Sequence, residues 1–134
     1  MGPAWTAASP LPGGDFPRAG LVGIAEDLQR GCAGLPPDTA CRLARSYGTL
    51  AATVLGGAAT IDGLGQQFGA GLYESEVRYL MTREWARCAE DVLWRRTKLG
   101  LRLDRGGAAA LERWMAEASG QATVPDARSA GDIA

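Results

Sequence analysis

Apolar residues recur along the chain at the spacing of amphipathic helices, in short stripes separated by glycine and proline. The first three stripes predict a helix over about residues 16–30, a second that starts after Pro37, and a short third that stops at Gly56 and Gly57. Their apolar positions are Leu21, Ile24, Ala25 and Leu28, then Ala40, Leu43, Ala44 and Tyr47, and then Leu50, Ala51, Val54 and Leu55. Asp15 and Thr49 are the expected N-caps of the first and third helices, because their side-chain oxygens can accept from free backbone N–H groups.

Three further stripes follow a glycine-rich segment, residues 58–72. The segment is interpreted as a loop that turns on its glycines, and a phosphate-binding loop is disfavoured because no strand pattern precedes it and no Lys-Ser/Thr pair follows. The next helix starts at Glu74 or Ser75, with Glu74 and Arg78 as a favourable pair. The first of these helices has the apolar face Val77, Leu80, Met81 and Trp85, and the last has Ala108, Leu111, Trp114, Met115 and Ala118. The helix between them carries Ala89, Val92 and Leu93, with Arg96 on the flank of this face.

The pattern as a whole predicts an all-α fold, a compact irregular bundle of five to seven short helices, because the helix breakers lie too close together for long helices. Residues 1–14 contain three prolines, which disfavour a helix or strand, so a linker is predicted there. Trp5 is the linker residue that is expected to be held in place by a contact. Residues 15–118 form the helical domain. Residues 119–134 are small and polar and are expected to be a disordered tail.

Composition narrows the classes of function. The formal net charge is -1, which implies neither nucleic acid nor an anionic membrane as a partner. The sequence has no histidine, so it lacks the usual general base and the commonest metal ligand. Three cysteines, with no CxxC pair, fit neither a disulfide framework nor a thiolate metal site, and they favour a reduced, cytoplasmic setting.

Two groups of charged residues are candidates for a catalytic or binding role. Glu84, Glu90 and Asp91 resemble paired carboxylates, but they fall at a helix-to-helix junction, where acidic residues stabilise a helix start. Asp91, three positions after Cys88, completes a weakened capping box and can pair with Arg95. The second group is a basic segment, residues 94–105, in which arginine and lysine alternate with Trp94 and leucines; it can contact phosphate, lipid headgroups or an acidic partner, or simply be a solvated face.

The residues 76–103, EVRYLMTREWARCAEDVLWRRTKLGLRL, closely resemble the C-terminal helical domain of FAD-dependent (aerobic) glycerol-3-phosphate dehydrogenases. Supporting resemblance comes from three more motifs, PLPGGDF at residues 10–16, RLARSYGT at 42–49 and LGQQFG at 64–69. The resemblance covers about residues 4–116. It implies a parent enzyme that oxidises sn-glycerol 3-phosphate to dihydroxyacetone phosphate with FAD, and passes electrons to quinone at the cytoplasmic membrane surface.

The same resemblance implies that this segment has no catalytic, cofactor-binding or metal-binding residues of its own, since the family carries its flavin on another domain. The expected role is to cap that FAD-binding domain and to support a homodimer. Two alternatives stay open: a free-standing helical module that recruits a partner protein, and a small nucleic-acid binder, which the net charge and Gly100 argue against.

Neighbouring positions on a helix point about 100° apart, which separates the roles expected in the basic segment. The candidate docking residues are Trp94, Arg95, Lys98 and Arg102. The candidate structural residues are Trp85, as a buried core ring, Asp91, as a helix cap, and Arg96, as a buried fork beside Val92 and Leu93.

Overall fold

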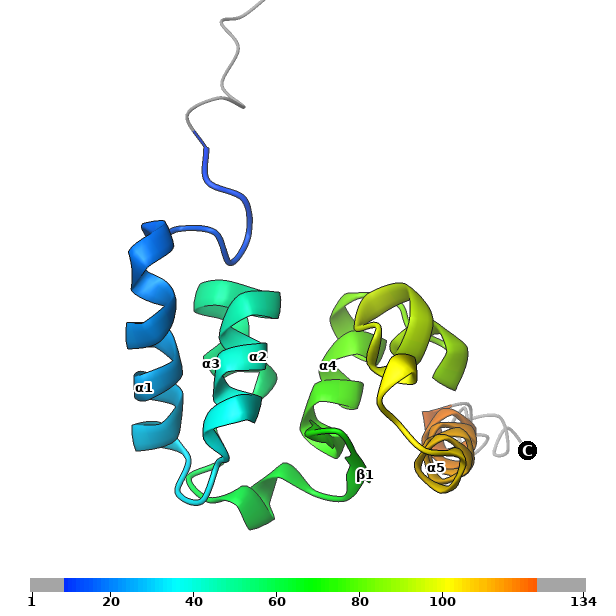
Figure 1. The fold of residues 1–134 in the computed structure, drawn as a ribbon. Helices are drawn as coiled ribbons and strands as arrows, with labels where there is room; N and C mark the ends of the chain where they lie inside the picture. Colours follow the sequence, from blue (N-terminus) through cyan, green and yellow to red (C-terminus); the bar gives the residue numbers. More distant parts are fainter. Residues whose placement is uncertain (1–8, 123–134) are drawn as a thin grey trace, which may run out of the picture. The chain divides into compact units, whose positions relative to one another are not determined.

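The computed structural model describes residues 9–122 and is mostly helical (Figure 1). Trp5 and the last twelve residues of the expected tail lie outside the described residues. The described chain divides into two compact units, residues 9–67 with 71–79, and residues 68–70 with 80–122. Each unit is described by itself below.

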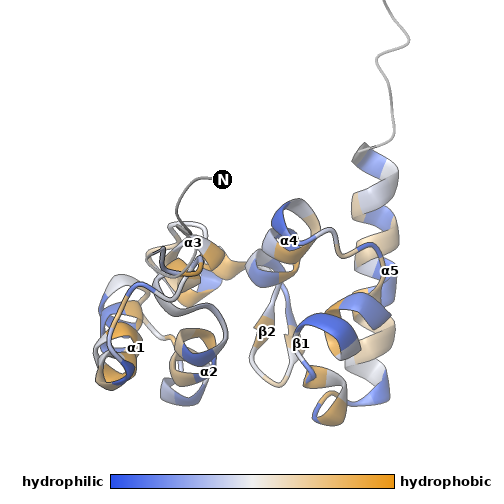
Figure 2. Ribbon diagram, turned by 90° about the horizontal axis from the view of Figure 1, so that it is seen from above, coloured by the Kyte–Doolittle hydropathy of each residue, from blue (hydrophilic) through white to orange (hydrophobic). Residues whose placement is uncertain are grey.

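The first unit is built on three helices that pack side by side (Figure 1). They are α1 (Leu21–Gly31), which continues a 3-10 turn η1 (Arg18–Gly20), α2 (Pro37–Tyr47), and α3 (Ala51–Val54), which follows the 3-10 turn η2 (Gly48–Leu50). Apolar and polar residues alternate around α1 and α2 at helical spacing (Figure 2). Their apolar faces form one buried cluster that includes Ala25, Leu28, Cys32, Leu35, Ala40, Leu43, Ala44, Ala51, Val54, Leu55, Leu64 and Tyr73.

The predicted stripes thus identified the core of the first unit, but not its caps. No side-chain hydrogen bond caps η1, α1 or α3, so Asp15 and Thr49 do not act as expected. The Thr49 N–H instead donates to the Gly13 carbonyl at 3.1 Å. A backbone hydrogen bond therefore joins Gly13, in the segment before η1, to η2.

The glycine-rich segment is more ordered than the expected loop. It holds a 3-10 turn η3 (Ile61–Leu64) and a two-stranded hairpin of β1 (Gln67–Gly69) and β2 (Leu72–Tyr73). Ala70 and Gly71 connect the strands with φ of 51° and 74°, and positive φ at both central residues is what a type I′ hairpin turn requires. The periodicity did not predict these strands because they are too short to show an alternation.

Helix α4 (Glu74–Arg83) starts where expected but ends earlier. The Glu84 and Ala86 N–H groups both donate to the Leu80 carbonyl, at 3.1 and 3.0 Å, and Trp85 between them has φ of 57°. This left-handed residue stops the helix, a position that glycine usually occupies. Trp85 therefore does not continue the apolar face of Val77, Leu80 and Met81.

The second unit contains a π-helical segment η4 (Asp91–Arg96), a 3-10 turn η5 (Leu99–Leu101) and the long helix α5 (Arg105–Ala122). Its buried apolar residues are Phe68, Leu80, Ala86, Ala89, Val92, Leu93, Leu99, Leu111 and Met115. The rings of Phe68 and Trp114 meet edge to face with centroids 5.9 Å apart. Asp104 caps α5, since its Oδ1 accepts from the Gly107 N–H at 2.7 Å.

The predicted all-α class is confirmed, with the hairpin as an addition. Helix α5 continues to Ala122, so residues 119–122, at the start of the expected tail, are helical. Within residues 9–122, none of the helices combines the length and the apolar character needed to cross a membrane.

Candidate functional site

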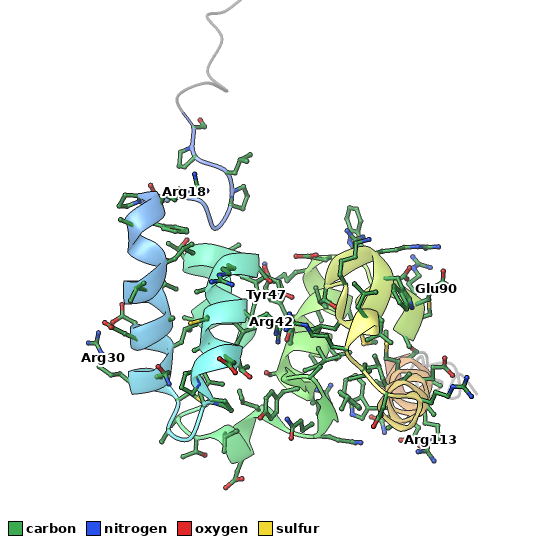
Figure 3. All side chains as sticks on the ribbon, viewed as in Figure 1. Arg18, Arg30, Arg42, Tyr47, Glu90 and Arg113 are labelled. Atoms are coloured by element: carbon green, nitrogen blue, oxygen red, sulfur yellow. The ribbon has the colours of Figure 1, made fainter. Side chains whose placement is uncertain are left out.

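The most extensive polar network of the first unit joins α2 to the start of α4. Both guanidinium Nη atoms of Arg42 donate to Glu76, Nη1 to Oε1 at 2.9 Å and Nη2 to Oε2 at 2.6 Å. Nη2 also donates to the Gly71 carbonyl at 2.9 Å, and the Tyr47 hydroxyl donates to Glu76 Oε1 at 2.8 Å. Figure 3 shows Arg42 and Tyr47 on the same side of α2. The Tyr47 ring also meets the Tyr79 ring edge to face, at 5.7 Å.

The charged side chains of this network are largely shielded from solvent. The side chain of Glu76 is 3% exposed and that of Arg42 is 17% exposed. Burial by itself lowers the pKa of Arg42, but the hydrogen bond and the charge of Glu76, with a smaller contribution from Tyr47, outweigh it and raise the pKa. Arg42 is therefore a cation held beside the buried carboxyl group of Glu76, and the network is a structural clamp.

Sequence reasoning did not single out Arg42 or Glu76. Each was counted only as part of a motif, and the two lie 34 positions apart. The available signal was weak: each directly precedes a residue of an apolar face, Leu43 or Val77. A charged residue at such a position is ordinarily solvated, so only the tertiary structure reveals the pairing.

The candidate docking residues all lie on exposed parts of the second unit. Arg95 pairs with Asp91 at 2.8 Å and lies 3.7 Å from Glu90, and Lys98 donates to the Trp94 carbonyl at 2.6 Å. Arg102 is exposed. The Trp94 ring is 45% exposed and lies over Gly100, where an added Cβ would overlap the ring. Gly100 therefore lets the indole fold back on the chain.

Of the three candidate structural residues, Asp91 lies as a cap should. Its Oδ2 accepts from the Arg87 N–H at 2.9 Å, and it also interacts with Cys88 and Arg95. The Arg87 hydrogen bond is the main reason that the pKa of Asp91 lies below its ordinary value, and burial opposes it. This carboxylate is held as an anion by its neighbours, which does not suit it to general acid catalysis.

The other two structural expectations are wrong. Trp85 is 80% exposed, because the helix ends before it and its left-handed backbone turns the ring away from the core. Arg96 is exposed, although Val92 and Leu93 are buried as expected. The segment 91–96 is π-helical, with the Thr97 N–H donating to the Val92 carbonyl, so positions along it do not follow the α-helical spacing that placed Arg96 on the apolar flank.

In the glycine-rich segment, the chain itself fills the space beside two glycines, since a Cβ at Gly65 would meet Glu74 and a Cβ at Gly71 would meet Thr39. In residues 9–122 there is also no group of three or more Cys, Asp or Glu side chains that could hold a metal ion.

Comparison with known proteins identifies the family of the chain. Residues 4–128 match the family model described as the C-terminal domain of alpha-glycerophosphate oxidase. The chain is 48% identical over 101 residues to glycerol-3-phosphate dehydrogenase of Pseudomonas aeruginosa, covering 75% of this chain and 20% of that protein. It is 40% identical over 117 residues to aerobic glycerol-3-phosphate dehydrogenase of Escherichia coli, covering 87% and 23%.

A third relative is named for a different substrate. D-erythritol 1-phosphate dehydrogenase of Brucella abortus is 40% identical over 119 residues, covering 89% of this chain and 24% of that protein. The chain thus spans no more than about a quarter of the length of these relatives. The family model nevertheless covers almost the whole chain, and the chain belongs to the family of C-terminal domains of alpha-glycerophosphate oxidase.

Proposed function

We propose that this chain is the C-terminal domain of an FAD-dependent glycerol-3-phosphate dehydrogenase, and that its own role is to cap and assemble the enzyme. The observation that carries the proposal is the 48% and 40% identity to two glycerol-3-phosphate dehydrogenases, with the aligned regions spanning only 20% and 23% of them. The parent enzyme would oxidise sn-glycerol 3-phosphate to dihydroxyacetone phosphate with FAD. It would pass the electrons to quinone at the cytoplasmic membrane surface.

A non-catalytic role agrees with the chemistry of the chain. The sequence has no histidine, and the best-formed ion pair, Arg42 with Glu76, is buried and structural. Asp91 is held by backbone and side-chain partners. None of these groups combines an accessible acid or base with a place for substrate, so the reaction belongs to the FAD-binding domain that the full-length relatives imply.

The second candidate substrate is an erythritol phosphate. It is favoured by the 40% identity to D-erythritol 1-phosphate dehydrogenase, over more of this chain than in the Pseudomonas aeruginosa comparison. A capping domain that does not contact the substrate would serve either enzyme. The choice between the two polyol phosphates therefore depends on the catalytic domain.

The surface proposed to meet the FAD-binding domain is the basic segment, residues 94–105. Trp94 and Leu101 are two of the large hydrophobic side chains that the described residues leave exposed, at 45% and 78%. Aromatic and arginine side chains dominate the energetics of many protein interfaces. Arg95 keeps its partners on its own helix, which leaves Lys98 and Arg102 as the more available charges.

The proposal is tested by comparing the purified chain with the full-length enzyme encoded by the same gene. The chain alone should be colourless and should not oxidise sn-glycerol 3-phosphate in a dye-coupled assay. The full-length protein should show flavin bands and oxidise it faster than D-erythritol 1-phosphate. A flavin spectrum from the chain alone refutes the capping role, and a preference for D-erythritol 1-phosphate selects the second substrate.

Docking is tested by charge reversal in the full-length enzyme. The double change Lys98→Glu and Arg102→Glu should weaken domain association or dimerisation, measured by sedimentation, while the melting temperature of the isolated chain changes little. Arg113→Glu, an exposed change on α5, is the matched control. Equal assembly of both variants would favour the alternative, a helical module with another protein as its partner.

A further inference from the structure

A shallow pocket lies between the start of α1 and α2, inside the first unit. Its volume is about 250 Å³, and its walls are Arg18, Ala19, Leu21, Val22, Cys41 and Arg45. Cys41 and Arg45 are one helical turn apart on α2, so both side chains lie on the same face. The two charged residues of the lining are both arginines, so the pocket has a positive electrostatic character.

The arginines that line the pocket differ from the other arginines of the first unit in their ion pairs. The first unit contains five arginines, and three of them form ion pairs: Arg30 with Asp27, Arg42 with Glu76 and Arg78 with Glu74. Arg18 and Arg45 form no ion pair with any residue of the described range 9–122. The two arginines without a carboxylate partner thus line the same pocket.

The remaining wall of the pocket is apolar. Val22 is 67% exposed, although it is a β-branched residue in the first turns of α1, and Leu21 beside it is partly buried against the core. A ligand that satisfies the whole lining needs an acidic group for the guanidinium groups and a short apolar part for Val22. Guanidinium groups bind phosphate and carboxylate oxygens with paired hydrogen bonds.

We propose that this pocket binds a small organic anion, a phosphate monoester or carboxylate with a short apolar substituent. The acidic headgroup lies between Arg18 and Arg45, and the substituent covers Val22. The site belongs to the first unit, whereas the basic segment belongs to the second, and the site does not depend on the proposed role in capping an FAD-binding domain.

Cys41 provides a built-in reporter for occupancy. Cys41 and Cys88 are exposed whereas Cys32 is buried, and Cys88 belongs to the second unit. The experiment measures the rate at which the neutral disulfide 2,2′-dithiodipyridine modifies each cysteine of the 134-residue chain, by peptide mapping, at constant ionic strength. Phenyl phosphate is the soluble probe, and benzyl alcohol is its uncharged control. Vesicles of phosphatidic acid in phosphatidylcholine test whether a lipid headgroup supplies the same anion.

Phenyl phosphate should slow the modification of Cys41 in a saturable way and leave the rate at Cys88 unchanged, and benzyl alcohol should protect neither. Arg18→Gln and Arg45→Gln should each raise the half-protecting concentration about threefold to tenfold, the range expected for one exposed charge-assisted contact. Arg30→Gln, which removes an exposed arginine outside the pocket, should not. Protection by the vesicles alone assigns the headgroup to a lipid and still supports an anion site.

Two results would overturn the site. One is equal protection of Cys41 and Cys88, which reports a general salt effect. The other is an unchanged rate at Cys41 with both probes. Chemical-shift changes in a ¹⁵N spectrum on adding phenyl phosphate give a second readout, which does not depend on thiol reactivity and should centre on the pocket residues.

Discussion

Arg42 and Glu76 are joined by two parallel hydrogen bonds across 34 positions of sequence, and this pair ties α2 to the first turn of α4. The ion pair is nearly enclosed, because the Glu76 side chain is 3% exposed. Its two other contacts, from the Tyr47 hydroxyl to Glu76 and from Arg42 to the Gly71 carbonyl, bring the hairpin turn into the same network. The Arg42–Glu76 pair therefore joins three segments of the first unit: α2, the hairpin turn and the start of α4.

Glu76→Ala should destabilise the chain by about 3–5 kcal/mol, since removal of one partner leaves the other charge buried without compensation. Urea unfolding followed by circular dichroism measures the change. The control is Arg78→Ala, which breaks the Glu74–Arg78 pair on the same helix. Because that pair is exposed, its loss should cost no more than about 0.5 kcal/mol. Similar costs for both variants would mean that the Arg42–Glu76 pair is not buried in solution.

Replacing Trp85 should not open the core. Since the ring is 80% exposed and the backbone is left-handed, Trp85→Gly should keep or raise the free energy of unfolding, by up to about 1 kcal/mol. Trp85→Ala keeps the strained backbone and should be the less stable of the two. Leu80→Ala, at a fully buried position of α4, is the contrasting change and should cost about 2–5 kcal/mol. A loss of about 2–5 kcal/mol for Trp85→Ala would mean that the indole ring is buried in the core, contrary to the structure.

Gly71 should tolerate a side chain less well than a second left-handed glycine does. Gly71 has φ of 74°, and an added Cβ would lie 2.6 Å from Thr39 Oγ1. Gly56 has φ of 64°, and nothing lies within 4 Å of its added Cβ. Gly56→Ala should therefore cost only the strain of the left-handed backbone, about 1–2 kcal/mol. Gly71→Ala should cost clearly more, and its melting temperature should be the lower of the two.

The Asp91 cap predicts a loss of stability in acid. Its pKa in the folded chain is lowered by the Arg87 N–H, so the stabilisation is complete above the pKa of an unfolded aspartate, about 3.9, and is lost as the pH falls through the folded value. Asp91→Asn should therefore lower the melting temperature at pH 6, and the difference from the parent should shrink below about pH 4. A difference that stays constant down to pH 2 would show that the carboxylate charge is not what caps the segment.

Much of the helical architecture could be read from the sequence. The i, i+3, i+4 spacing of residues such as Leu21, Ala25 and Leu28 located α1, and the same rule located α2, α4 and α5. This succeeds because a helix buries one stripe whatever it packs against, so its apolar period is a local property of the chain. The motif around residues 76–103 also identified the family.

Three features depended on tertiary structure. Trp85 was assigned to an apolar face because its spacing fits, but the end of α4 is set by the Ala86 to Leu80 hydrogen bond and carries no glycine to mark it. Arg96 was assigned to the apolar flank from the α-helical period, which does not apply because residues 91–96 are π-helical.

The pairing of Arg42 with Glu76 joins residues that no local pattern connects. Periodicity and motif are local properties of the chain, and they were enough to locate the helices and to identify the family. Which charges are buried was decided only when distant segments met, and where α4 stops without a glycine was seen only in the structure. The cost of leaving a buried polar group unpaired can be assessed only in the packed molecule.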